Sequence, residues 1–245
     1  MKQMIRQETM IKNIQEEFKK LSNPKYAAQL QKYFKTGEGE YAEGDLFLGL
    51  RVPVIRKIAK KYSEISISEA SEFLQSPFHE KRLFSLLVLT DLFRKTDEEN
   101  RKKIYDLYLE NTNFINNWDL VDSSAGYIVG AYLLTRDKKP IYTLAKSTNL
   151  WERRIAIMAT SYFIRHNEFT DTLKIAEILL DDKEDLIHKA VGWMLREIGK
   201  KDVELEEIFL KKHYQEMPRT MLRYAIEKFP EEKRKSFLKG HYKST

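Results

Sequence analysis

A pattern of paired helical segments, repeated at steps of 32 to 40 residues, is the feature that most constrains how this chain can fold. The second segment of each pair opens with a polar or aromatic residue, continues with a charged one and then runs into small apolar residues. The charged position recurs at Arg82, Asp122, Arg154, Lys189 and Arg223. Such a period is typical of stacked helical hairpins, each of which buries its apolar face only against its neighbours.

We therefore predict an all-α fold, an α-solenoid of helical repeats whose second helices line a concave basic face. Residues 1–245 are expected to form a single repeat domain, because no linker or change in composition divides them. With 9 Gly and 6 Pro, the chain has few helix breakers. An irregular helical bundle is the alternative fold.

Hydrophobic periodicity places the helices, and capping residues help to locate their ends. Asn23 and Pro24, for example, suit the N-cap and the first turn of a helix. The clear loop is Gly37–Gly44. Helices are expected over residues 3–21, 24–34, 53–62, 68–74, 77–93, 97–108, 118–134, 140–145, 151–165, 171–180, 185–200, 204–214 and 218–229.

The formal net charge of +6 is compatible with a polyanionic partner. A cation repeated at one point of successive second helices would build a basic strip that can follow the phosphates of duplex DNA. The chain has no cysteine, which excludes disulfides and thiolate metal sites. Because no signal peptide or membrane-spanning stretch is present, we expect a cytoplasmic protein without a membrane partner. We also expect a monomer.

Trp118 and Asp122 form the most suggestive pair for chemistry. Four residues apart, they share one face of a helix, where an indole plane beside a carboxylate could hold a cationic group. Equally, Trp118 could belong to the core and Asp122 could be a charge favoured near a helix start. Trp151 is expected to be a core residue.

Other reaction templates fit poorly. The chain has no Gly-rich phosphate loop, and its five histidines show no metal-ligand spacing, so we expect them at the surface. Ser123 and Ser124 follow Asp122, but no histidine is placed to activate them, and helix capping explains them better. We expect neither a metal nor a cofactor.

At these residues the sequence resembles the AlkD-like family of bacterial DNA alkylation repair proteins. The resemblance extends from about residue 15 to residue 230 and preserves the order of the family's motifs. The matching pieces are Tyr33, Phe47-Leu48-Gly49 followed by Pro53 and Arg56, NWDLVD at 117–122, WERRIA at 151–156 and KAVGWMLRE at 189–197.

The resemblance implies HEAT-like repeats that hold duplex DNA, and hydrolysis of the N-glycosidic bond of purines alkylated at N3 or N7. It implies that Asp122 is the catalytic carboxylate and that Trp118 and Trp193 contact the deoxyribose and backbone of the lesion. Arg154 would hold the backbone nearby, and Tyr33 would complete the aromatic cleft. Arg82, Lys189 and Arg223 are expected to contact DNA as members of the basic strip.

The segment Gly37–Asp45 departs from the family pattern, since it is longer and more acidic. Its carboxylates would sit awkwardly beside phosphates, and the segment could displace Tyr33. Two alternatives to a glycosylase therefore stay open: a catalytically inactive DNA-binding relative and a protein-binding α-solenoid scaffold.

Overall fold

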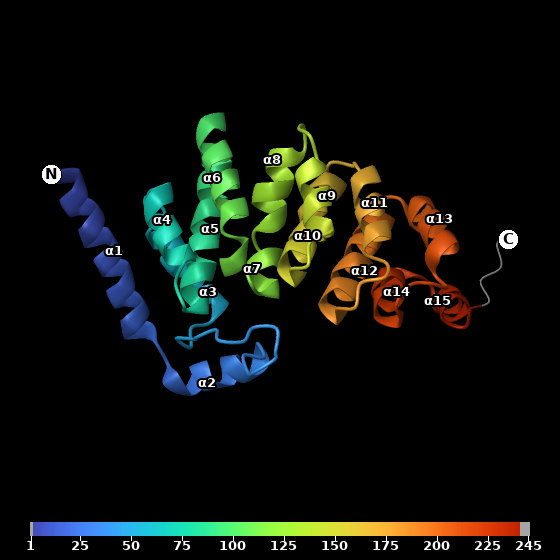
Figure 1. Ribbon diagram of the computed structural model, residues 1–245, viewed down its shortest axis with the longest axis horizontal. Helices are drawn as coiled ribbons and strands as arrows, with labels where there is room; N and C mark the ends of the chain where they lie inside the picture. The colour runs from blue at the N-terminus through green and yellow to red at the C-terminus, as the bar shows by residue number, and fades with distance from the viewer. Residues whose placement is uncertain (1, 241–245) are drawn as a thin grey trace. The chain divides into compact units, whose positions relative to one another are not determined.

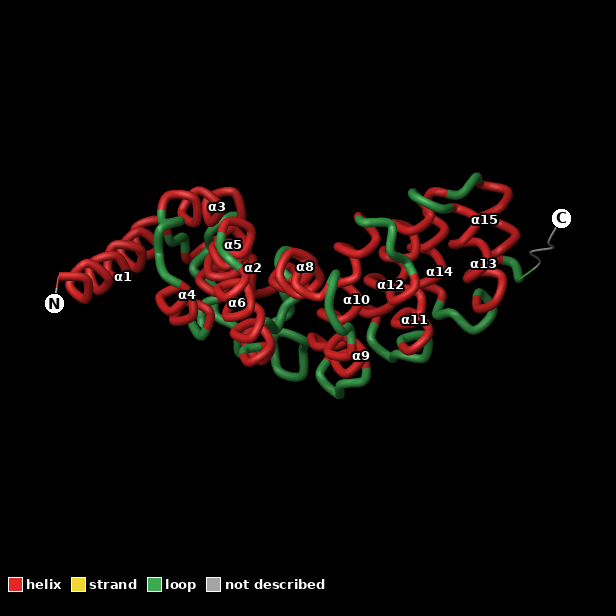
Figure 2. Tube along the Cα trace, turned by 90° about the horizontal axis from the view of Figure 1, so that it is seen from above, coloured by secondary structure: helices red, strands yellow, loops and turns green. Residues whose placement is uncertain are grey.

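The computed structural model describes residues 2–240, which fold into helices joined by short connections (Figures 1 and 2). Within those residues the one strand-like pairing is an isolated bridge between Leu46 and Phe78. None of the helices described is long and apolar enough to span a bilayer. The chain divides into two compact units, one ending at Ser124 and the other beginning at Ala125.

The first unit is organised around one long buried helix, α5. This helix packs against α3, α4, α6 and α7, and its core side chains include Leu83, Phe84 and Leu86. Phe84 meets Phe18 of α1 edge to face at 5.6 Å, which ties the first helix to this core. The helices are α1 (Lys2–Leu21), α2 (Pro24–Tyr33), α3 (Val52–Lys61), α4 (Ile67–Leu74), α5 (His79–Lys95), α6 (Glu98–Glu110), η1 (Thr112–Phe114) and α7 (Trp118–Asp122).

The second unit is a run of helical pairs. Its second helices α10, α12 and α14 pack in succession, and each also contacts a neighbouring first helix or connection. The elements are η2 (Gly126–Gly130), α8 (Ala131–Leu133), α9 (Lys139–Ala145), α10 (Leu150–Arg165), α11 (Thr170–Ile178), α12 (Asp185–Gly199), α13 (Val203–His213), α14 (Arg219–Ala225), η3 (Ile226–Lys228) and α15 (Glu231–Leu238).

The repeated charged position keeps one register within the second helices. It is the fourth residue of α5 and the fifth residue of α7, α10, α12 and α14, counted from the first residue of each helix. Because the period reflects one structural unit used repeatedly, the prediction of an all-α helical-repeat fold is confirmed. The single domain and the concave basic face stay predictions.

The helix predicted over residues 118–134 is interrupted. The α-helix α7 ends at Asp122, and the chain continues as a π-helical segment, Gly126–Gly130, before α8. Gly126 and Gly130 let this segment lie directly against α10, where a side chain at Gly130 would overlap the carbonyl oxygen of Ala159. The interruption depends on this packing, which hydrophobic periodicity does not report. Helix α15, after Pro230, was not predicted.

Replacing Gly130 with alanine is expected to lower the free energy of unfolding. Alanine normally favours a helix by about 1 kcal/mol over glycine, but here its methyl group would meet Ala159 and the Tyr162 side chain, the latter at 2.9 Å. Overpacking of this kind typically costs about 1–3 kcal/mol. Urea denaturation of wild type and Gly130→Ala measures the difference in the free energy of unfolding.

Gly37→Ala is the matched control, since its added methyl group would meet only the flexible Glu40 side chain, at 3.1 Å. We expect that control to stay within about 1 kcal/mol of the wild type. An unchanged or raised stability for Gly130→Ala would contradict the close packing of η2 on α10.

Candidate functional site

The short helix α7 begins at Trp118 and ends at Asp122, the two residues paired in the sequence analysis. Asn117 caps its start, with the side-chain oxygen accepting from the Trp118 backbone N–H at 2.9 Å. Leu120 and Val121 are buried, whereas Trp118 and Asp122 are both half-buried. Helical spacing therefore places an indole and a carboxylate, one turn apart, on the same side of α7.

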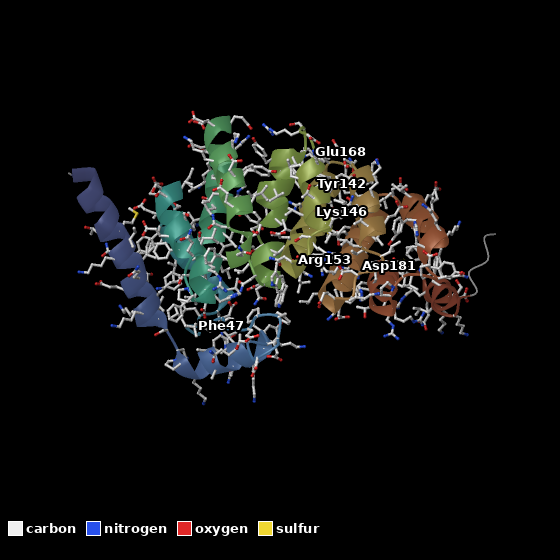
Figure 3. The ribbon with its side chains drawn as sticks, viewed as in Figure 1. Phe47, Tyr142, Lys146, Arg153, Glu168 and Asp181 are labelled. Atoms are coloured by element: carbon white, nitrogen blue, oxygen red, sulfur yellow. The ribbon has the colours of Figure 1, made fainter. Side chains whose placement is uncertain are left out.

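Trp118 packs against a compact cluster of rings within the first unit, in which Phe34 also lies 4.9 Å from His79. Its ring stacks on Phe34 at 5.4 Å, Phe34 stacks on Phe47 at 5.2 Å, and Phe47 stacks on His79 at 4.7 Å. Phe47, labelled in Figure 3, comes from the connection between α2 and α3. Since aromatic stacking is directional, the contact with Phe34 favours one plane of the indole as well as its position.

Tyr33 lies edge to face with Trp118 at 6.2 Å and is 64% exposed. The two rings border a cavity of about 430 Å³ that is lined mainly by apolar side chains of α2, α3, α5 and α7 and of the α2–α3 connection. Tyr33 and Trp118, predicted to share an aromatic cleft, are thus neighbours in the structure.

A buried group of charges underlies this cleft. Nε2 of His79 lies 2.9 Å from Asp119, the residue after Trp118, and Nδ1 lies 3.7 Å from Asp45. Asp45 also accepts a hydrogen bond from Arg82 at 2.6 Å and one from Asn116 at 3.0 Å. These contacts connect α5, the end of the acidic loop and both sides of the start of α7.

The same contacts shift proton affinities. Burial by itself would lower the pKa of His79, but the charges and hydrogen bonds of Asp119 and Asp45 outweigh it and raise the pKa to about 9. Burial acts to raise the pKa of Asp45, but contacts with His79, Arg82 and Asn116 hold it below its usual value. At neutral pH His79 is therefore protonated and Asp45 is ionised.

Two sequence predictions need correction here. Histidines were expected at the surface, but His79 is 2% exposed and His213 is also buried. Arg82 was expected to contact DNA, but it is 3% exposed, and its guanidinium bonds Asp45 and the carbonyls of Ser76 and Pro77. Its charge is already engaged inside the protein, so it has no exposed face for a phosphate.

The acidic loop proves to be internally satisfied rather than directed at the cleft. Glu40 and Glu43 accept hydrogen bonds from the backbone N–H groups of Gly37 and Gly39, each at 2.9 Å. Asp45 is turned inward, and Tyr33 still adjoins Trp118. The loop therefore does not separate Tyr33 from Trp118, because ion pairs beneath the cleft hold the end of the loop.

Glu80 is a further residue that sequence reasoning missed. Its buried carboxylate accepts hydrogen bonds from the backbone N–H groups of Leu48, Gly49 and Leu50 at 2.9, 2.8 and 3.1 Å. Glu80 thereby anchors the connection that carries Phe47 to the start of α5. The available signal was a cluster of titratable residues, His79 to Arg82, at the start of a helix whose middle is apolar.

In the second unit the aromatic and basic candidates occur on α10, α12 and α14. Trp193 is half-buried and donates from Nε1 to Glu197 at 3.0 Å. Lys189, one turn earlier, pairs with Asp185 at 2.7 Å, and that hydrogen bond raises the pKa of Lys189. Arg223 is exposed.

Arg154 is 5% exposed and donates to the Leu186 carbonyl, which ties α10 to the start of α12. Its positive charge acts to lower the pKa of Lys189, so these two predicted DNA contacts lie near each other. The preceding Arg153, labelled in Figure 3, instead pairs with Asp182 at 2.6 Å. Trp151 is 6% exposed, which confirms its assignment to the core.

Chemically, the first unit offers an aromatic cleft suited to a planar or cationic group. The acidic residues that line it are Glu80 and Asp119, whereas Asp122 lies outside the lining. The described residues include no cluster of three or more His, Asp or Glu side chains able to hold a metal ion. Ser123 and Ser124 donate to the Leu120 carbonyl at 3.2 and 2.6 Å, as expected for serines with a helix-terminal role.

The raised pKa of His79 predicts that stability falls with rising pH. A group that binds its proton more tightly when folded stabilises the protein fully below its unfolded pKa, about 6.5, and loses that contribution as the pH passes 9. Each tenfold change in proton affinity corresponds to about 1.4 kcal/mol. We therefore expect wild type to lose about 3 kcal/mol, relative to His79→Gln, between pH 6 and pH 10.

Urea denaturation across this pH range measures the difference between the two proteins. His166→Gln serves as the control, because His166 is an exposed histidine and should leave the pH dependence of wild type intact. Parallel curves for wild type and His79→Gln would show that the buried imidazole is uncharged.

Comparison with known proteins identifies one family that matches most of the chain. Residues 14–229 match the family described as DNA alkylation repair enzyme. A structure described as a predicted DNA alkylation repair enzyme from Enterococcus faecalis is similar at 17% identity and a TM-score of 0.67, over 86% of this chain and 97% of that one.

AlkD2 from Streptococcus mutans is similar at 20% identity and a TM-score of 0.53, over 84% of this chain and 98% of the other. A search of curated proteins gives no match. At these identities the structures support the fold, and the family assignment rests on the match over residues 14–229. The chain belongs to the DNA alkylation repair enzyme family.

Proposed function

We propose that this protein is a monofunctional DNA glycosylase that hydrolyses the N-glycosidic bond of N3- or N7-alkylated purines in duplex DNA. The observation that carries the proposal is the side of α7 that bears Trp118 and Asp122, next to the exposed ring of Tyr33. Family membership supports a role in DNA alkylation repair. The cleft supports recognition of a cationic, planar lesion.

The chemistry needs little acid catalysis. A purine alkylated at N3 or N7 is already cationic and leaves as a neutral base when the bond to C1′ breaks. The sugar gains oxocarbenium character in the transition state, and the fixed negative charge of Asp122 stabilises it and orients the attacking water. Water forms the new bond to C1′ and loses its proton, which gives an abasic sugar without a covalent protein intermediate.

The other candidates have supporting roles in this proposal. The indoles of Trp118 and Trp193 contact the deoxyribose and backbone of the lesion nucleotide, with an attraction of about 1 kcal/mol each. Lys189 and Arg223 supply positive charge for the phosphates. The predicted phosphate contact of Arg154 is not kept, because its side chain is 5% exposed and donates to the Leu186 carbonyl. Tyr33 completes the wall beside Trp118. Arg82 is no longer included, because its charge is buried with Asp45.

Replacing Asp122 with asparagine is expected to lower the single-turnover rate of 7-methylguanine release by on the order of 10²–10³-fold. Asparagine keeps the size of the side chain but removes the negative charge that opposes the oxocarbenium. The assay is base release from methylated duplex DNA. Asp181→Asn, at the exposed carboxylate labelled in Figure 3, removes an equal charge and should keep the wild-type rate.

Equal rates for Asp122→Asn and wild type would remove Asp122 from the mechanism. If wild type releases no base yet binds DNA with an affinity that falls steeply with salt, the protein is a catalytically inactive DNA-binding relative. If it does not bind duplex DNA at all, a protein-binding scaffold is the better description.

A further inference from the structure

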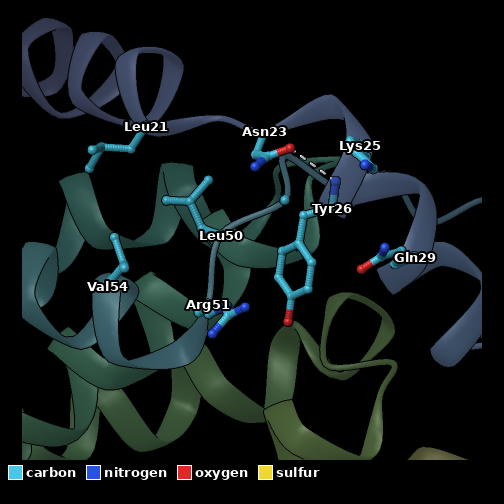
Figure 4. Close-up of a pocket in the computed structure, with 9 residues that line it drawn as sticks. Leu21, Asn23, Lys25, Tyr26, Gln29, Leu50, Arg51 and Val54 are labelled. Carbon is cyan, nitrogen blue, oxygen red and sulfur yellow. Dashed lines mark hydrogen bonds between the residues drawn. The ribbon is translucent and has the colours of Figure 1, made fainter.

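A second pocket, of about 340 Å³, opens between the start of α2 and the start of α3 (Figure 4). Its polar lining consists of Asn23, Lys25 and Gln29 on one side and Arg51 on the other, with the Tyr26 ring between them. Leu21, Leu50 and Val54 also line the pocket, so the polar and cationic groups stand around an apolar floor. None of the roles assigned above uses it.

The charged side chains that line this pocket are both cationic. No carboxylate lines it, and both Lys25 and Arg51 are exposed. Neither cation has an ion-pair partner among the described residues, whereas Lys61 of the same unit pairs with Glu17 at 2.5 Å. Arg51 instead lies over the Tyr26 ring at 5.3 Å, an arrangement that orients the guanidinium and leaves its N–H groups available.

The two sides of the pocket are joined rigidly. The backbone N–H of Asn23 donates to the Leu48 carbonyl at 2.8 Å. Gly49, with a φ of +82°, lies so close to the Asn23 carbonyl that any side chain there would overlap it. Glu80 holds the same backbone from below. The cations at Lys25 and Arg51 are therefore presented on a fixed frame, which reduces the entropy lost when an anion binds.

The pocket adjoins the aromatic cleft. Tyr26, Leu50 and Arg51 line both cavities, so a group held by Arg51 lies one residue's width from the cleft beside Trp118. Planar guanidinium and ammonium groups without acidic neighbours are the usual partners of phosphate oxygens. A nucleic-acid strand carries a phosphate beside every nucleotide, so a strand entering the cleft has phosphates next to it.

We propose that this pocket is a binding site for a phosphodiester of the DNA backbone, contacted by Arg51 and Lys25. The choice of DNA as the source of the anion rests on the proposed function, but binding here does not require excision. The site acts on affinity and positioning, since neither side chain is part of the carboxylate chemistry of Asp122.

The test measures the affinity for an undamaged 12-base-pair duplex as a function of salt concentration. Each lost phosphate contact should flatten the plot of log K against log salt by about 0.9. We expect this change for Arg51→Gln and for Lys25→Gln, and about twice this change for the double variant. Arg51→Lys retains the charge and should stay near the wild-type slope.

Lys12→Gln is the matched control, because Lys12 is an exposed cation of the same unit that lies outside the pocket. It should leave the salt slope unchanged, and thermal unfolding confirms that every variant is folded. Wild-type slopes for both Arg51→Gln and Lys25→Gln would overturn the proposal. So would binding of inorganic pyrophosphate that depends on Arg51 while the duplex slopes stay equal, since the pocket would then hold a small anion.

The outcomes separate this site from the proposed function. A flattened slope in the variants of a protein that excises no base supports the phosphate site and rejects the glycosylase. Normal excision with unchanged slopes rejects the phosphate site alone.

Discussion

The structure of the first unit depends on a buried group of charges, in which His79 lies between Asp119 and Asp45 and Arg82 also pairs with Asp45. Removing charges from water costs several kcal/mol per ion, so such a group persists only when its members neutralise one another at close range. Because its members come from α5, α7 and the connection after α2, their pairing determines where those three segments meet.

The buried charges also determine the position of Trp118. Its neighbour Asp119 is held by His79, and its ring stacks on Phe34, which itself contacts the same histidine. Ionic pairing and aromatic stacking therefore act on the indole together. The proposed glycosylase reaction would depend on such rigidity, because misplacement of a positioning group by about 1 Å can cost a large factor in rate.

For the acidic loop Gly37–Asp45, composition and structure lead to different conclusions about its carboxylates. By composition, Gly37–Asp45 is a poor neighbour for phosphates. In the structure, Glu40 and Glu43 bond their own loop, and Asp45 neutralises buried cations. Lys25 and Arg51 are among the described cations of this unit for which no ion pair forms. Net charge is thus less informative about a polyanion site than the list of charges that have no partner.

The sequence by itself determined the helical class, the repeat and the register of the second helices, because these follow from hydrophobic periodicity within each segment. It also indicated Trp118 and Asp122 as a pair, since four-residue spacing is a local property of a helix. Only the tertiary structure decided that Arg82 is internal and that His79 is charged and buried. Their partners lie 37 and 40 residues away, beyond the reach of any local pattern. The π-helical segment at Gly126–Gly130 was likewise decided by contact with α10, because close packing between distant helices leaves no periodic trace in either one.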